Sequence, residues 1–169
     1  MAALHRWKPG WRAGLAAAGS RLARARHFRG HGVHSPFVYA IVREVFMRTP
    51  LLPGDRTLYR ALLAAGVAER RAVQLQNLAI HAGYDTFGLN RADAAFCIAT
   101  RDLPRAELLA LTGAATRTGA TVAVLDPDAG RERRALCRQL VAMHRSTSVD
   151  NRAYLLLFNN HLPKQHFIL

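Results

Sequence analysis

The chain has 169 residues, half of them hydrophobic, and carries 24 Lys and Arg against 11 Asp and Glu, for a formal charge of +13. This length fits one domain with a sizeable core and a short appendage. No segment reaches the roughly 18 uninterrupted apolar residues of a membrane helix, and Arg12 and Gly14 interrupt a signal-peptide-like start, so we expect a cytoplasmic protein.

The positive charge is concentrated at the start of the chain, where residues 1–50 hold nine basic residues and one acid. Such a segment attracts polyanions such as RNA, DNA or an anionic membrane surface. The alternative is a genome of high GC content, which favours Arg and Ala in any protein. Composition alone does not decide between these interpretations.

Residues 1–30 are predicted to form a basic helical extension in front of a domain over residues 31–169. Between residues 11 and 28 the sequence consists mainly of Ala, Leu and Arg, which are strong helix formers. The apolar face is mostly alanine and buries too little area for firm membrane anchoring, so we favour a solvated helix lying on its own domain. The residues of this helix that would bind a polyanion are Arg21, Arg24, Arg26 and Arg29.

Residues 31–46 carry the clearest helix signal in the chain. Ser35 is a good N-cap, because its hydroxyl accepts a bond from a free amide of the first turn. Pro36 follows at the first helical position, where its missing N–H costs nothing. Two rows spaced by four residues then predict a wide buried face: Phe37, Ile41 and Val45 in one row, and Val38, Val42 and Phe46 in the other.

The rest of the chain predicts alternating strands and helices. Asp55 begins and Gly66 ends a helix around residues 58–65. Residues 72–80 alternate apolar and polar side chains, as a strand does. The other expected elements are strands over residues 94–99, 121–125, 146–149 and 154–158, and helices over residues 104–111 and 131–144. We therefore expect an α/β fold with a mostly parallel sheet of about five strands and an antiparallel C-terminal hairpin at one side.

Cys97 and Cys137 are the only cysteines, and each has apolar neighbours. Without a C-x-x-C spacing they predict two buried structural thiols in a reducing compartment.

Three stretches resemble a family of bacterial class I S-adenosylmethionine-dependent methyltransferase-like proteins, best populated in the Bacteroidetes. They are residues 31–39, residues 121–126, similar to the family's fifth strand and its terminal acid, and residues 155–158 with 163–169, similar to its C-terminal strand and Lys-Gln-x-Phe tail. The resemblance implies a reduced Rossmann-like, methyltransferase-like domain over residues 31–169. The matching motif residues, all structural, are His31, Gly32, His34, Ser35, Pro36, Phe37, Lys164 and Gln165.

The resemblance also indicates where the cofactor would bind, at a glycine-rich turn after the first strand. The closest match is residues 77–84, in which Asn77 stands in place of an acid and Ala79 in place of the first glycine, and Gly83 alone fits. The cofactor positions implied in this way are Asn77, Ala79, His81, Gly83, Tyr84 and Asp126. A Cβ where bare backbone is needed blocks the approach of a ligand.

The spacing argues more strongly against a complete cofactor site. Only ten residues separate Gly83 from the next buried strand at Ala94. The family places two more strands and their helices in this interval, and one such unit needs about 30 residues. In the family those strands lie together at one edge of the sheet, beyond the first strand. We therefore expect a truncated sheet with no cofactor, or S-adenosylmethionine only if the ancestral site survives.

Three functions remain open. The first is a non-catalytic interaction module whose exposed first strand, with polar Gln74, Gln76 and Asn77, pairs with a second copy or docks on a true methyltransferase. The second is a surviving methyltransferase, with catalytic residues unknown, candidate acids Asp85, Asp126, Asp128 and Asp150, and His81 and Tyr84 near the cofactor turn. For Asp126 and Asp128 we favour a turn that caps the helix from residue 131.

The third function is RNA or polyanion binding through the basic first 30 residues, with Trp7, Trp11 and Phe28 available for stacking. Two groups of histidines, the first being His27, His31 and His34 and the second His161 and His166, lack the companions of a zinc site, so no metal is expected.

Overall fold

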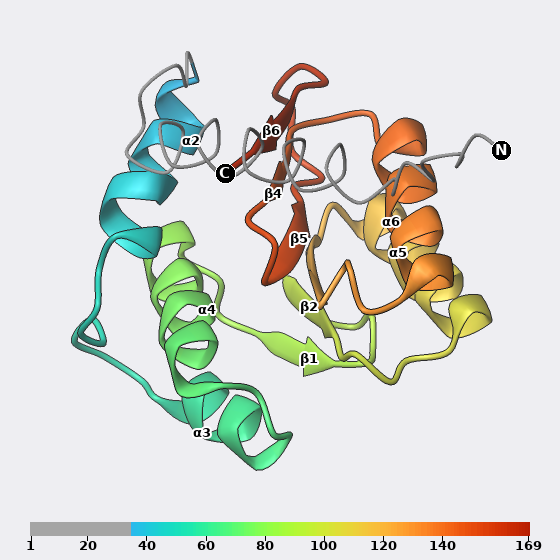
Figure 1. Cartoon of the computed structure of the whole chain (residues 1–169). Helices are drawn as coiled ribbons and strands as arrows, with labels where there is room; N and C mark the ends of the chain where they lie inside the picture. Colours follow the sequence, from blue (N-terminus) through green and yellow to red (C-terminus); the bar gives the residue numbers. More distant parts are fainter. Residues whose placement is uncertain (1–34) are drawn as a thin grey trace, which may run out of the picture.

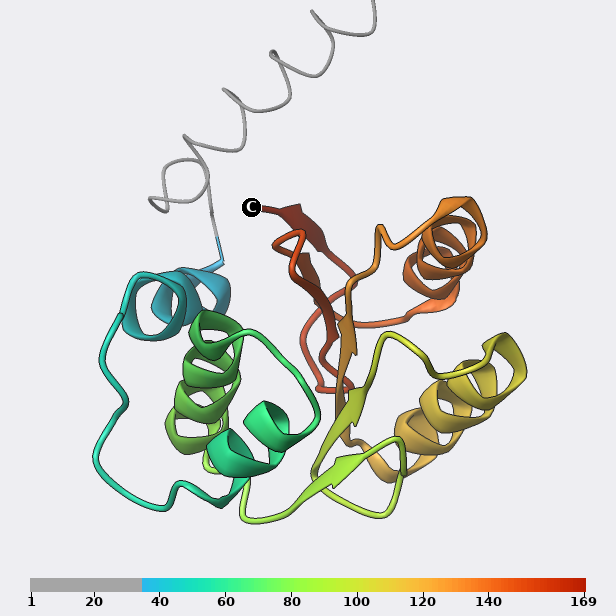
Figure 2. The same cartoon turned by 60° about the horizontal axis from the view of Figure 1, so that its bottom comes forward.

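The computed structural model describes residues 35–169 (Figure 1). A six-stranded sheet lies between two helical layers, with α2, α3 and α4 on one face and α5 and α6 on the other (Figure 2). The elements in chain order are α2 (Pro36–Ile41), the π-helical turn η1 (Val42–Phe46), α3 (Thr57–Ala64), α4 (Glu69–Ala82), β1 (Phe87–Leu89), β2 (Phe96–Ala99), α5 (Arg105–Thr118), β3 (Thr121–Leu125), α6 (Arg131–Met143), β4 (Ser148–Asp150), β5 (Tyr154–Leu157) and β6 (His166–Ile168). The extension over residues 1–30, including Arg21, Arg24, Arg26 and Arg29, lies outside the described residues, as do His31, Gly32 and His34.

The strand order is β1-β2-β3-β5-β4-β6. β1, β2 and β3 are parallel neighbours, β5 runs antiparallel between β3 and β4, and β6 is parallel to β4. The α/β class and the β4–β5 hairpin are confirmed, whereas the mostly parallel sheet of about five strands is wrong, because the sheet is mixed and has six. The antiparallel strand β5 lies inside the sheet and not at its side, because β4 and β6 follow it in the strand order. β6 pairs with β4, and the Leu169 amide extends this pairing by donating to the Asp150 carbonyl at 2.8 Å.

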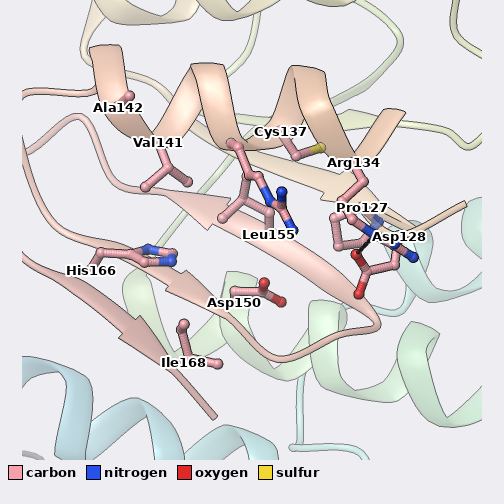
Figure 3. A pocket seen from close by; sticks show the side chains of 11 residues that line it. Pro127, Asp128, Arg134, Cys137, Val141, Ala142, Asp150, Leu155, His166 and Ile168 are labelled. Carbon is pink, nitrogen blue, oxygen red and sulfur yellow. Dashed lines mark hydrogen bonds and ion pairs between the residues drawn. The ribbon is translucent and has the colours of Figure 1, made fainter. Parts of the chain in front are cut away.

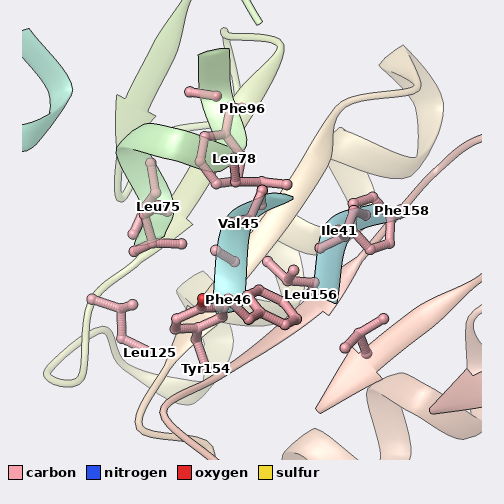
Figure 4. Packing of buried hydrophobic residues seen from close by; sticks show 14 of the residues in the cluster. Ile41, Val45, Phe46, Leu75, Leu78, Phe96, Leu125, Tyr154, Leu156 and Phe158 are labelled. Carbon is pink, nitrogen blue, oxygen red and sulfur yellow. The ribbon is translucent and has the colours of Figure 1, made fainter. Parts of the chain in front are cut away.

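The predicted helix after Ser35 begins as expected. The Ser35 hydroxyl accepts from the Val38 amide at 3.4 Å, and Pro36 lies in the first turn. The helix then widens into η1, where the Met47 amide bonds to the Val42 carbonyl five residues back. Five of the six predicted core residues are buried, and Phe37 is half-buried against Phe158 at a ring-centroid distance of 5.0 Å. Figure 4 shows this face packed against the strands and α4.

The strand predicted over residues 72–80 is wrong, because these residues belong to the helix α4. Leu75 and Leu78 are buried in the core, but so are Gln74, Gln76 and Asn77, for which the alternating pattern predicts an exposed strand edge. These amides satisfy backbone groups of other segments. Gln76 accepts from the Tyr59 amide at 2.9 Å, and Gln74 donates to the Phe46 carbonyl at 3.1 Å.

Asn77 forms two such bonds at once. Its side-chain oxygen accepts from the Leu52 amide at 2.8 Å, and its nitrogen donates to the Pro50 carbonyl at 3.0 Å. Gln74 also accepts from the Tyr154 hydroxyl at 3.2 Å, which ties α4 to β5. Because buried polar groups need partners, the amides hold α4 against η1, the loop after it and α3. The periodicity in this stretch therefore reflects buried hydrogen bonding and not an exposed strand face.

A second apolar cluster lies between the sheet and the α5–α6 layer, and it contains both cysteines. Both thiols are buried and free, as predicted. Burial raises the pKa of the Cys137 thiol to about 11, which keeps it protonated and unreactive at neutral pH.

β1 is a strand that the sequence did not predict, and its connection to β2 is short. Parallel strands usually need a crossover of about a dozen residues or more, but residues 90–95 make this one with six. The connection lies directly over β1, since a Cβ added to Gly88 would stand 2.7 Å from Arg91 Cγ and 3.0 Å from the Arg91 carbonyl oxygen. Only glycine fits this position of the strand without a shift of the crossover.

Candidate functional site

A crevice of about 390 Å³ opens outside the carboxyl ends of β2 and β3. Open α/β sheets bind ligands at this end of their strands. Its walls come from the start of α4 and from the residues that follow β2 and β3; they include Gly66, Arg71, Thr100, Arg101, Asp102 and Asp126. Of the predicted cofactor residues, only Asp126 lies here.

Asp126 is held by both its backbone and its side chain. Its φ of +47° is unusual for a residue other than glycine, and its amide donates to the Ala153 carbonyl at 2.9 Å. The carboxylate forms a part-buried ion pair with Arg71 of α4, at 2.5 Å. A ligand that bound to Asp126 would therefore have to displace Arg71.

The segment after β3 is a turn, as predicted for Asp126 and Asp128. The Ala129 amide donates to the Asp126 carbonyl, and the Gly130 amide to the Asp128 carbonyl at 2.7 Å. The predicted cap is wrong, because Gly130 is the N-cap of α6 and no side chain bonds to the first turn. Asp128 instead forms an exposed ion pair with Arg134 at 2.8 Å.

Arg133 of α6 binds the carboxyl ends of β2 and β3 from the face of the sheet opposite α4. Its guanidinium donates to the Leu125 carbonyl at 2.8 Å and to the Thr100 carbonyl at 2.8 Å, with a longer bond to the Asp126 carbonyl. Carbonyls at strand ends are the groups to which a ligand hydroxyl or amide would donate. Arg133 occupies them and leaves positive charge beneath the crevice.

The carboxyl end of β1 is occupied by a side chain as well, that of Asn90. The Asn90 side chain accepts from the Thr100 amide and donates to the Thr100 hydroxyl, both at 2.8 Å, and so bridges the ends of β1 and β2. Residues 90–95 contain no glycine. The turn that follows the first observed strand therefore lacks the bare backbone that the resemblance implies for a cofactor site.

The predicted cofactor residues before β1 have structural positions instead. Asn77 and Ala79 lie within α4, and His81 is in its exposed last turn. Gly83 ends the helix with a left-handed φ of +70°. Tyr84 stacks on Phe96 and shares a hydrogen bond of 2.7 Å with the Thr121 hydroxyl, and its burial raises the pKa of the phenol. The strand-and-turn geometry on which this assignment depended is absent from residues 72–84.

The four candidate acids do not come together. Asp126 lies in the crevice and Asp85 is exposed before β1, whereas Asp128 and Asp150 line a groove beside α6. Lys164 and Gln165, which carry part of the resemblance, hold the last strand in place. Lys164 donates to the Ala142 carbonyl at 2.6 Å, and the Gln165 carbonyl accepts from the Ser148 amide at 2.8 Å.

The sequence does not predict the roles of Arg71, Arg133 and Asn90. No local pattern distinguishes the two arginines from the others of α4 and α6. A weak signal existed for Asn90, since Asn tolerates the left-handed backbone that it adopts here (φ +56°) at the end of a short apolar run.

Comparison with known proteins gives no relative. No family model matches the chain, and neither a curated protein nor a solved structure is similar enough to match it. Among residues 35–169, no helix combines the length and apolarity needed to cross a membrane. In the same part of the chain, no three His, Cys, Asp or Glu side chains are grouped so that they would hold a metal ion.

Proposed function

We propose that the chain is a shortened class I methyltransferase-like domain that does not bind S-adenosylmethionine and acts through association with another protein. The six-residue connection between β1 and β2 carries this proposal. In the family, this interval contains the second and third strands with their helices, and this part of the fold binds the ribose of the cofactor. Six residues are fewer than a single strand–helix–strand unit requires.

The strand order supports the same interpretation. Doubly wound folds have the order 3-2-1-4-5-6. β1, β2 and β3, parallel and adjacent in chain order, match the strands numbered 1, 4 and 5. The missing second and third strands would lie beyond β1, and within the described residues nothing pairs with β1 on that side.

Calorimetric titration of the full chain with S-adenosylmethionine and S-adenosylhomocysteine tests the loss of the cofactor. We expect no binding heat with millimolar ligand, because Asn90 and the crossover fill the end of β1. A dissociation constant in the micromolar range would refute the proposal. It would favour a surviving methyltransferase, a second candidate supported by the position of Asp126 in a crevice at the carboxyl ends of the strands.

The free edge of β1 is the surface that we assign to association. The Thr86 carbonyl and the Asn90 amide bond to β2. Since a parallel ladder uses alternate residues, the amides and carbonyls of Phe87 and Leu89 point away from β2. These groups are available to an added strand, either from a second copy of the chain or from another protein.

Leu89→Pro tests this assignment, because proline removes one edge N–H and keeps an apolar side chain. Leu89→Val is the matched control, because it keeps the amide. Sedimentation over a range of concentrations should show self-association for the wild type and for Leu89→Val, and its loss for Leu89→Pro. If the wild type stays monomeric, the pairing partner is not a second copy. If Leu89→Pro associates as the wild type does, β1 is not the interface.

A further inference from the structure

A groove of about 360 Å³ lies between α6 and the strands β4 and β6 (Figure 3). Val149 and Phe167 pack into the cluster on the α2–α4 side of the sheet. Their neighbours Asp150, His166 and Ile168 therefore face the other side. Ile168 is 43% exposed, because α6 covers the neighbouring part of the sheet and leaves this part open.

Arg134 and Arg138 of α6 line one wall of the groove together with Asp128, and Arg131 extends the arginine row beyond the groove. Arg131, Arg134 and Arg138 are spaced by three and four residues, so they project from one side of α6 over about 10 Å of its length. All three are exposed. Arg134 pairs with Asp128, but both side chains are about half exposed, and such a pair contributes little. Within residues 35–169, Arg131 and Arg138 form no ion pair.

The rest of the groove suits a flat, partly polar group. Leu155 and Val141 supply an apolar floor, and the His166 ring and the Asp150 carboxylate project into the space (Figure 3). The ring is oriented by a bond of 2.9 Å between its Nδ1 and the Ser148 hydroxyl. One Asp150 oxygen accepts from the Arg152 amide, and the other has no hydrogen bond within the described residues.

We propose that this groove binds single-stranded RNA, with phosphates along the arginine row and one unstacked base between the apolar floor and His166. Single-stranded RNA is recognised by bases stacked on flat side chains and by contacts to the 2′-hydroxyl. Asp150 repels phosphate but accepts from a 2′-hydroxyl or a base amino group, which directs the backbone towards α6. A duplex does not fit, because its bases are already stacked and paired. This site is distinct from the basic residues 1–30.

Fluorescence anisotropy of the full chain with a labelled single-stranded oligouridine tests the arginine row. The variant is Arg134→Ala with Arg138→Ala, and the control is Arg56→Ala with Arg60→Ala, which removes two exposed arginines at α3 and leaves the same net charge. Each lost phosphate contact lowers the salt slope by about 0.7. The variant should therefore bind about tenfold more weakly near physiological salt, with a slope lower by about 1.4, and the control should match the wild type.

The stacking contact has its own test. His166→Ala should weaken binding several-fold, whereas His166→Phe should retain it, because a ring remains for the base. Three results would overturn the proposal: equal effects of the two double variants, competition by polyglutamate as effective as by RNA, or no RNA binding by the full chain at low salt. Thermal melts of each variant establish that the loss is not caused by unfolding.

Discussion

Replacing Gly88 by Ala tests the short crossover over β1. In the folded chain the added methyl would lie 2.7 Å from Arg91 Cγ and 3.0 Å from the Arg91 carbonyl oxygen. The crossover does not move away freely, because the Asn90 amide bonds to the Ile98 carbonyl and the Ala95 amide bonds to the Thr86 hydroxyl. Forcing a methyl group into such a space typically costs about 1–3 kcal/mol, and we expect that loss in the free energy of unfolding.

The sign of the effect makes this experiment decisive. Gly88 does not have a positive φ, so without the crossover an alanine would stabilise the chain by about 0.4–1 kcal/mol through the unfolded state. Gly113→Ala is the control, because it lies within α5 with its nearest neighbour 3.9 Å from the added methyl, and it should stabilise by about 0.5–1 kcal/mol. Urea titration measures both. A Gly88→Ala protein as stable as the wild type would refute the reasoning.

Three further perturbations test the polar contacts that fix the fold. Asn77→Leu leaves the part-buried Leu52 amide and Pro50 carbonyl without their partner. It should cost about 2–4 kcal/mol in urea unfolding, because each unsatisfied group costs about 1–3 kcal/mol; a loss below about 1 kcal/mol would mean that water replaces the amide. Lysine lacks the planar guanidinium with which Arg133 donates to the Thr100 and Leu125 carbonyls, so Arg133→Lys should lower the melting temperature by several degrees. The exposed substitution Arg138→Lys should leave the melting temperature unchanged. Burial lowers the pKa of His144 below its ordinary 6.5, so the unfolded chain binds the proton first and stability should fall as the pH drops below about 6.5. His144→Gln should weaken the dependence of the melting temperature on pH between about pH 5 and 7.5. An unchanged dependence would mean that another group, for example His166, is responsible for it.

The sequence predicted the elements that local rules determine. β2 and β3 are short apolar runs buried on both faces, and Ser35 with Pro36 is a start signal that depends on neighbouring residues only. The first strand was misplaced because Gln74 and Asn77 are polar yet buried. Their partners, such as Phe46 and Leu52, lie more than 20 residues away, and no periodicity reveals such bonds.

The candidate site was only partly predictable, for a related reason. Asp126 follows a clear strand, so its place at the carboxyl end of the sheet could be expected. Arg71 and Arg133 reach that place from two helices on opposite faces, and their roles depend on tertiary structure. β1 escaped detection because three residues with a central glycine carry too little pattern to indicate a strand.

The most direct test of the central claim is an NMR titration of the ¹⁵N-labelled full chain with S-adenosylhomocysteine. It follows the backbone amides of residues 90–95 and of Thr100, which line the position that a nucleoside would occupy beside β1 and β2. We predict that these signals stay in place with millimolar ligand. Saturable shifts of these amides with a micromolar midpoint would show that the six-residue connection leaves room for the ligand, and would contradict this prediction.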